Sequence, residues 1–208
     1  METANQTSKP NLEQIQIVPK HGEEPFHAGT DTLGFSLRDF WQWAVSDLLC
    51  NLMRGHLAEF IVGKAIGSPG TVRNEWAAYD LQTPNGTKIE VKSAAYLQSW
   101  AQDGYSQIQF NVEKTKALDS EKGGYRGEPR RCADVYVFAV LAHKDKPTVD
   151  PLNVNQWEFY VLPAKTLNER TRSQHSITLK SLIELSGGAV GYFKLAERIR
   201  SLEAAPKA

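Results

Sequence analysis

The sequence contains few of the residues that form cross-links or membrane spans. It has two cysteines, Cys50 and Cys132, among 208 residues. Two cysteines are too few for a four-ligand zinc site or a disulfide scaffold, so a reducing, cytoplasmic location is expected. No run of about eighteen apolar residues is present, so we expect no membrane-spanning helix and no membrane partner. Residues 1–16 are polar and lack the apolar centre of a signal peptide, so secretion is not expected.

The chain also lacks an excess of either charge. Its 24 basic and 24 acidic side chains balance, which argues against a protein that holds nucleic acid by bulk electrostatics alone. The distribution is uneven, because residues 1–35 carry two lysines and five acids, a net charge of −3, and the remainder therefore carries +3. This mild basic bias is compatible with a phosphate-bearing substrate.

The sequence divides into a polar arm and one domain. Residues 1–33 are rich in Asn, Gln, Glu, Thr and Pro with little periodicity, which predicts a flexible N-terminal arm. Residues 34–208 are numerous enough for a single domain with a sizeable core. The hydrophobic share of 41% is that of an ordinary soluble globular chain and excludes collagen or a mostly disordered protein.

Apolar spacing predicts the element order of the domain. Helices are predicted over residues 36–49, 52–66, 176–185 and 192–202. The second of these is expected to begin after Asn51 as a cap and to end at Gly67. Strands are predicted over 76–82, 88–96, 107–112, 133–141 and 157–162, and a helical turn followed by a mobile loop over 114–131. The resulting order, α-α-β-β-β-β-β-α-α, predicts an α/β domain with a mixed central β-sheet flanked by helices.

A hairpin signal sets the register of the first two strands. In the triplet Pro84-Asn85-Gly86, proline suits the first central position of a type I turn, asparagine the second, and glycine the left-handed residue that follows. Counting back from this three-residue loop places Asp80 directly opposite Glu90 on one face, with β-carbons about 5 Å apart. A two-residue loop at Asn85-Gly86 would shift the register by one and turn Asp80 away from Glu90. The turn chemistry favours the first register.

Asp80, Glu90 and Lys92 are the candidate catalytic residues. Glu90 and Lys92 are two apart on one strand, so both leave the same face. Adjacent carboxylates repel each other, and a hard cation relieves that repulsion. Mg²⁺, for which Mn²⁺ can substitute, takes one or two carboxylates and keeps other positions for water and phosphate oxygens. A nearby lysine adds a positive donor for charge that develops on a phosphate, which suits phosphodiester hydrolysis. The alternative is a cross-strand salt-bridge cluster on a solvated sheet face.

Glu59 is a further candidate acid, on the predicted helix over residues 52–66. It lies four residues from Gly55 and from Gly63, so the three form one narrow stripe. Glycines on either side let the helix approach another element closely while Glu59 reaches out between them. This arrangement suits a buried, metal-facing carboxylate, and an ordinary surface acid is the alternative.

Tyr79-Asp80 and Glu90-Val91-Lys92 together resemble the signature of the PD-(D/E)XK, or restriction-endonuclease-like, nuclease superfamily. In that signature an acid ends one strand, and Glu or Asp, any residue, and Lys follow on the next. The resemblance covers about residues 40–162. It departs from the signature in having Tyr79 where the signature names proline. The resemblance implies a restriction-endonuclease-like fold for residues 34–208.

The resemblance also implies a role for each residue of the motif. Asp80, Glu90 and the carbonyl of Val91 would hold the metal ion. Lys92 would orient or help deprotonate the attacking water and offset charge on the phosphate. Glu59 stands where the superfamily often has a helix acid, so it would bind a second metal or position the water network.

Four side chains outside the motif are candidate contacts with nucleic acid. Gln98 follows the lysine strand and is placed to contact phosphate or metal-bound water, with capping or solvent exposure as the alternative. Residues 113–131 have six cations against four acids, so Arg126, Arg130 and Arg131 are candidates to clamp a phosphate backbone. A solvated connection is the alternative reading of that segment.

The expected function is that of a Mg²⁺-dependent nuclease, an endonuclease rather than an exonuclease, acting on DNA in preference to RNA. Restriction, phage defence and DNA repair are the expected settings. No helicase, methylase or recognition domain fits in the chain, so specificity is expected from loops, from a homodimer or from a separate recognition subunit. The alternatives are a catalytically inactive nucleic-acid-binding or assembly module of the same fold, and a nuclease acting on RNA or tRNA.

Overall fold

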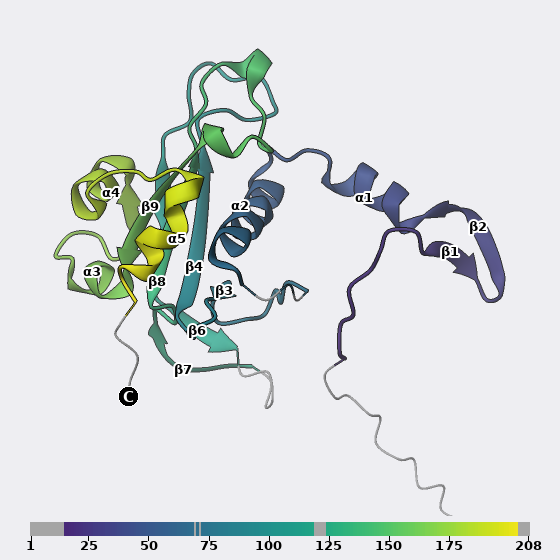
Figure 1. Cartoon of the computed structure of the whole chain (residues 1–208), viewed down its shortest axis with the longest axis horizontal. Helices are drawn as coiled ribbons and strands as arrows, with labels where there is room; N and C mark the ends of the chain where they lie inside the picture. The colour runs from purple at the N-terminus through teal and green to yellow at the C-terminus, as the bar shows by residue number, and fades with distance from the viewer. Residues whose placement is uncertain (1–14, 69, 71, 119–123, 204–208) are drawn as a thin grey trace, which may run out of the picture.

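A four-stranded sheet lies at the centre of the computed structural model, which describes residues 15–68, 70, 72–118 and 124–203 (Figure 1). The strand order is β3-β4-β8-β9, formed by β3 (Leu81–Gln82), β4 (Lys88–Ala95), β8 (Val135–Leu141) and β9 (Trp157–Pro163). Strands β4 and β8 run parallel, and the other two pairings are antiparallel. The predicted mixed α/β sheet is confirmed, and the architecture is consistent with a restriction-endonuclease-like fold.

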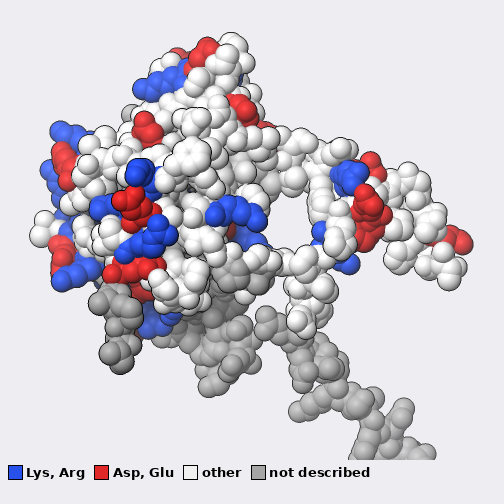
Figure 2. All heavy atoms as spheres, in the orientation of Figure 1, with Lys and Arg blue, Asp and Glu red and all other residues white. Residues whose placement is uncertain are grey.

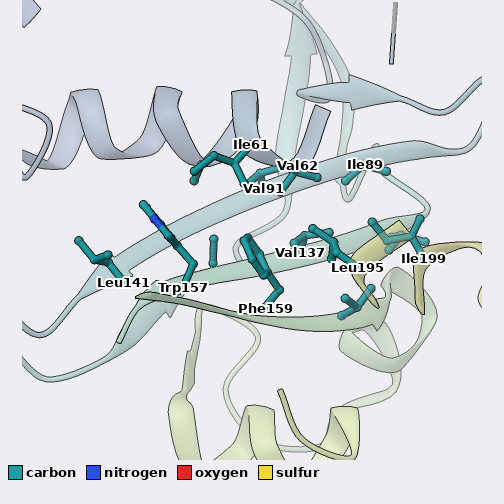
Figure 3. Packing of buried hydrophobic residues seen from close by; sticks show 14 of the residues in the cluster. Ile61, Val62, Ile89, Val91, Val137, Leu141, Trp157, Phe159, Leu195 and Ile199 are labelled. Carbon is teal, nitrogen blue, oxygen red and sulfur yellow. The ribbon is translucent and has the colours of Figure 1, made fainter. Parts of the chain in front are cut away.

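Two helices cover one face of the sheet, α2 (Asn51–Ile66) and α5 (Tyr192–Arg200). Their apolar side chains pack on alternate residues of the strands (Figure 3), among them Ile61, Val62, Ile89, Val91, Val137, Phe159, Leu195 and Ile199. Strand β8 is buried along its whole length, as the sequence predicts for a central strand with both faces covered.

The opposite face carries a second apolar layer. It is built by α3 (Ala164–Glu169), α4 (Leu179–Ser186) and a small sheet of β5 (Gln109–Asn111) with β10 (Ser176–Thr178). Tyr136 and Phe138 point into this layer. Glu90 and Lys92 are their parallel neighbours in register. Glu90 and Lys92 therefore leave the sheet on the face opposite to α2.

Helix α2 begins and ends close to the predicted residues. Cys50 is the N-cap, one residue before the predicted Asn51. The shift arises because Asp47 Oδ1 accepts the backbone N–H groups of Leu49 and Cys50, at 3.0 and 3.1 Å, and so forms the turn that precedes the helix. Gly67 ends the helix with φ +66°, the left-handed conformation that glycine adopts without strain.

The predicted strand over residues 76–82 is wrong in length. Only Leu81 and Gln82 are paired. The side-chain oxygen of Asn74 accepts the N–H of Trp76 at 3.0 Å and folds the preceding residues into a turn. Asparagine competes with strand pairing in this way, and periodicity does not detect it. Strand β5 is likewise shorter than the predicted 107–112.

The prediction for residues 114–131 is also wrong. It contains a hairpin of β6 (Thr115–Leu118) and β7 (Tyr125–Arg130) where a helical turn and a loop were predicted. Gly124 and Gly127 have positive φ, at +84° and +77°. These glycines allow the chain to turn and bulge within a paired ladder.

The C-terminal part of the domain differs from the prediction at two points. Residues 176–178 form β10 rather than the start of a helix, because Thr178 is the N-cap of α4 and accepts the N–H of Ser181 at 3.4 Å. Helix α3 was not predicted, nor were two short 3₁₀ helices, Lys146–Thr148 and Val154–Gln156. No helix in the described ranges combines the length and the apolar character that a membrane crossing requires.

The N-terminal part of the described chain stands away from this body (Figure 1). It consists of β1 (Pro25–Ala28), β2 (Asp31–Ser36) and α1 (Leu37–Val45). We name residues 25–45 the N-terminal extension. Its hairpin lies largely within the predicted flexible arm over residues 1–33 and ends at Ser36, just beyond it. Residues 1–14 lie outside the described residues, so the flexible arm over 1–33 stays a prediction.

Candidate metal-binding and catalytic site

The hairpin that carries the candidate acids has the predicted three-residue loop. The N–H of Thr83 donates to the carbonyl of Thr87 at 2.9 Å, and Gly86 has φ +89°. Leu81 pairs with Ile89 and Gln82 with Lys88. This is the register counted from the turn chemistry, and the alternative two-residue loop is therefore wrong.

Asp80 lies directly before β3, at the edge of the sheet. Its N–H donates to the carbonyl of Ile89 at 3.0 Å, and its Oδ2 accepts the N–H of Val91 at 2.7 Å. The predicted ladder pair between Asp80 and Glu90 is thus replaced by a side-chain contact to the next residue of β4. This edge position exposes the Asp80 carboxylate to groups from both faces of the sheet.

Glu90 and Lys92 lie together, as expected for residues two apart on a strand. Lys92 Nζ donates to Glu90 Oε1 at 2.6 Å, and both side chains are partly buried. An ion pair of the kind foreseen in the salt-bridge alternative is therefore present. It accounts for one acid and one cation of the group, and Asp80 is not part of it.

The electrostatic environment of Asp80 is unfavourable to a carboxylate. Burial, and after it the charges of Glu90 and Glu59, raise its pKa to about 7. The hydrogen bond from Val91 and the charge of Lys92 lower the pKa and only partly offset the rise. Repulsion among carboxylates that raises a pKa is relieved when a cation binds between them.

Glu59 approaches Asp80 from α2, on the other face of the sheet. Its side chain is 12% exposed and is held by Arg73, whose Nη2 donates to Oε1 at 2.9 Å and whose Nε donates to the other oxygen. Arg73 also pairs with Glu75. Glu59, Arg73 and Asp80 line one open pocket of about 650 Å³. The three acids Glu59, Asp80 and Glu90 are therefore near neighbours. Glu59 pairs with Arg73 and Glu90 with Lys92.

Gly63 has the close-approach role predicted for the glycine stripe, and Gly55 does not. A β-carbon added at Gly63 would lie 3.4 Å from a methyl group of Leu81, whereas one added at Gly55 would meet open space. The close contact at Gly63 brings α2 against β3. It thereby brings Glu59, one turn earlier on the helix, near Asp80.

The donor chemistry of these residues fits a hard divalent cation. Among the described residues, no three acids, histidines or cysteines are already grouped as metal ligands. Mg²⁺ does not need three, because it takes one or two carboxylates and fills its other positions with water and substrate oxygens. Asp80 and Glu90 supply two carboxylates, and the repulsion that raises the pKa of Asp80 is the feature that a bound cation relieves.

Gln98 does not join this site. It is buried, and its side chain accepts from Arg54 Nη1 at 3.3 Å and donates to Ser106 Oγ at 3.2 Å. Its backbone N–H is bonded to Gln102. A side chain enclosed in this way is not available to a phosphate, so we reassign Gln98 from nucleic-acid contact to a structural role.

The three candidate arginines of the segment 114–131 are placed differently from one another. Arg131 is buried, and its guanidinium donates to the carbonyl of Val112 at 2.7 Å and to Asn168 at 2.7 Å. It therefore holds the chain together and is also reassigned to a structural role. Arg130 is exposed on β7. The side chain of Arg126 lies outside the described residues.

Arg73 is the one residue of the site that sequence reasoning missed. It belongs to the segment between α2 and β3, which has no periodic pattern and no spacing that relates Arg73 to Glu59, fourteen residues earlier. Only the folded contact reveals the pair, so no sequence signal could have found it.

A mixed sheet flanked by helices, with acids and a lysine on one hairpin, is consistent with the restriction-endonuclease-like class of α/β proteins. A comparison with protein-family models matches bacteriophage T4 endonuclease IV over residues 29–181. The chain belongs to this nuclease family. The matched range includes Glu59, Asp80, Glu90 and Lys92. A comparison with curated proteins gives no match.

Proposed function

We propose that the protein is a Mg²⁺-dependent endonuclease of the PD-(D/E)XK superfamily that cleaves DNA in restriction, phage defence or repair. The observation that carries the proposal is Asp80, a half-buried carboxyl group whose pKa is raised to about 7 by burial, Glu90 and Glu59. It lies on the same hairpin as a partly exposed lysine. Membership of the bacteriophage T4 endonuclease IV family supports endonuclease activity and DNA as the substrate.

The carboxylates of Asp80 and Glu90 and the carbonyl of Val91 are the proposed ligands of Mg²⁺, and Mn²⁺ suits the same oxygen donors. The metal ion supplies a lowered pKa for bound water and neutralises charge on the phosphate. The N–H of Val91 fixes the orientation of the Asp80 carboxylate. That hydrogen bond leaves the second oxygen of Asp80 as the one available to a ligand.

Lys92 is the proposed proton-handling and charge-stabilising group. Its ammonium is held at 2.6 Å by Glu90, which keeps it beside the candidate ligands. From this position Nζ orients the attacking water through a hydrogen bond and donates to a phosphate oxygen as negative charge develops there. Glu59 is proposed to position the water network or to hold a second metal ion, with Arg73 offsetting its charge.

Cleavage of supercoiled plasmid tests this proposal. We expect the wild type to nick the plasmid in Mg²⁺ and not in EDTA, and Lys92→Ala to be slower by on the order of 100-fold or more. Lys165→Ala is a matched control, since Lys165 makes only an exposed ion pair with Glu169, and it should cleave as the wild type does. If wild type and Lys92→Ala were equally inert on DNA and RNA with several divalent metals, the catalytic proposal would be lost.

A non-catalytic module is the second candidate function. The Lys92–Glu90 ion pair favours it, because a satisfied pair can be purely structural. In that case nucleic acid would bind without being cut and Lys92→Ala would leave the binding unchanged. Cleavage of RNA or tRNA with no cleavage of DNA would instead show that the same site acts on RNA and not on DNA.

A further inference from the structure

The N-terminal extension has no core of its own. None of the residues of β1, β2 or α1, all of which the structure describes, is buried. Two-stranded hairpins and nine-residue helices are marginal in water without a surface to pack on. The extension nevertheless exposes a set of large apolar side chains: Phe26, Leu33, Phe35, Phe40, Trp41 and Trp43. Trp43 alone is 84% exposed. Such a segment needs a partner surface.

The turn between α1 and α2 is fixed to the body of its own chain, and the extension lies apart from that body. Asp47 accepts the N–H groups of Leu49 and Cys50 through one carboxylate oxygen, and the hydroxyl of Ser99 through the other at 2.7 Å. The turn is therefore tied to the segment that follows β4. In the space-filling view an open gap separates the extension from the body (Figure 2).

Helix α2 presents an uncovered apolar stripe beside this gap. Leu52 and Phe60 are eight residues apart on its outer side, and Phe60 is 61% exposed. Ala58 and Ile61, in contrast, pack into the core of the sheet. Trp76, on the loop that follows α2, is exposed as well. We name Leu52, Phe60 and Trp76 the α2 face. Residues 15–17 of the same chain line a pocket beside Trp76, but the exposed side chains of the N-terminal extension lie apart from the α2 face (Figure 1).

Charge favours a protein partner that resembles the body of this chain. Residues 15–46 carry two cations, Lys20 and Arg38, against four acids, so this segment is unsuited to the phosphates of nucleic acid. Residues 47–208 carry 21 cations and 18 acids. Residues 15–46, which include the extension, thus have a net charge of −2 and residues 47–208 one of +3, and these opposite signs favour contact between the segment of one copy and the body of another.

The apolar area is sufficient for a stable dimer. If a full aromatic residue offers roughly 200 Å², the six exposed side chains of the extension present about 600 Å². Two such segments, each covering an equal area on the other chain, would together bury more than the roughly 1,600 Å² of a standard protein interface.

We propose that the N-terminal extension packs against the α2 face of a second copy of this chain, and that the second copy reciprocates. The result is a twofold dimer in which the segments are exchanged, an isologous arrangement that closes on itself. Phe60 also lines the pocket that contains Glu59 and Asp80. The exchanged segment therefore lies beside the candidate site of the other copy.

Sedimentation velocity across a concentration series tests the dimer. Wild type should be dimeric at micromolar concentration. Trp43→Asp, on the extension, and Phe60→Asp, on the α2 face, should each weaken dimerisation by on the order of 100-fold, because each removes both symmetric contacts. Phe193→Asp is the matched control, an 81% exposed aromatic on α5 that belongs to neither surface, and it should stay dimeric. All three positions are exposed, so circular dichroism should show wild-type folding.

Mixing the two variants identifies the contacting surfaces. The Trp43→Asp chain keeps an intact α2 face and the Phe60→Asp chain keeps an intact extension, so an equimolar mixture should recover a heterodimer through one intact contact. A monomeric wild type, a Trp43→Asp or Phe60→Asp variant that still dimerises like the wild type, or a mixture that stays monomeric would each overturn the proposal.

Discussion

Two polar clusters lie where α2 meets the β4 hairpin, and they differ in how their charges are satisfied. In the first, Arg54 is 4% exposed, and its guanidinium donates to Ser93, Asn51, Gln98 and the carbonyl of Leu49. Each described partner is a neutral acceptor, and each of the three guanidinium nitrogens donates to at least one of them. In the second, the acidic cluster of Glu59, Asp80 and Glu90, burial and the repulsion between like charges together raise the pKa of Asp80.

This difference separates a structural cluster from a functional one. A buried polar group that serves the fold is fully hydrogen-bonded, because each unmet bond lowers stability. A group that serves a ligand keeps unfavourable interactions that the ligand relieves. Arg54 fits the first description and Asp80 the second. Changes to the two clusters should therefore have opposite consequences for stability and activity.

The largest expected effect is on catalysis. Asp80→Asn removes a proposed metal ligand while keeping the size of the side chain, so plasmid cleavage should fall by on the order of 1,000-fold. The folded state should survive. Initial rates of nicking in Mg²⁺ measure the loss, with Asp145→Asn, a change at an exposed acid, as the control. An Asp80→Asn variant that cuts as fast as wild type would remove Asp80 from the site.

The next largest effect is on stability, at the other cluster. Arg54→Met fills similar space but leaves the acceptors on Asn51, Ser93 and the buried Gln98 without their donor, so the free energy of unfolding should drop by about 3 kcal/mol. Urea denaturation measures it. Arg38→Met, which loses only an exposed pair with Glu23, should change stability by less than about 0.5 kcal/mol. If both variants were equally stable, the Arg54 cluster would not support the fold.

The pH dependence of stability should also distinguish the clusters. The Asp80 carboxyl group ionises near pH 4 in the unfolded chain and at about pH 7 in the fold. Between these values the folded state holds a proton that the unfolded state has lost. The unfolding free energy should therefore fall as pH rises from 4 to beyond 7, by on the order of 2–4 kcal/mol.

Asp80→Asn should remove this contribution and be the more stable protein at pH 8. The measurement is urea denaturation at several pH values, with wild type and variant compared at each. An identical pH profile for the two proteins would show that Asp80 titrates normally.

A smaller effect is expected at Arg73. Arg73→Gln leaves Glu59 without its cation, so repulsion of Asp80 grows and stability at pH 8 should fall by about 0.5–1 kcal/mol. The partial exposure of Arg73 limits the size of the change. Arg38→Gln serves as the control in the same denaturation series. A gain in stability from Arg73→Gln would mean that Glu59 does not act on Asp80.

Local turn chemistry made the centre of the site predictable. Pro84, Asn85 and Gly86 specify one loop, and from that loop the pairing of Leu81 with Ile89 follows. The same loop predicts that Asp80 and Glu90 lie close together on neighbouring strands. It did not foresee that Asp80 would leave the ladder and bond Val91 through its side chain, because a free N–H at a strand edge exists only in the folded sheet.

Features that depend on tertiary contacts were not predictable. The burial of Gln98 and Arg131 follows from neighbours far along the chain, such as Arg54 and Asn168. The hairpin of β6 and β7 lacks the alternation that marks a strand with one buried face. Strand β1 and the first half of β2 lie in residues 1–33, whose polar composition predicts a flexible arm. In each case the composition indicates the chemistry of the residues but not which residues they contact in the fold.

Calorimetric titration of Mg²⁺ into the protein tests the central claim most directly, namely that Asp80 and Glu90 together hold a cation. The wild type should show saturable binding, and Asp80→Asn should bind at least about tenfold more weakly. Asp145→Asn should match the wild type. Equal binding by wild type and Asp80→Asn, or no saturable binding by either, would contradict the claim.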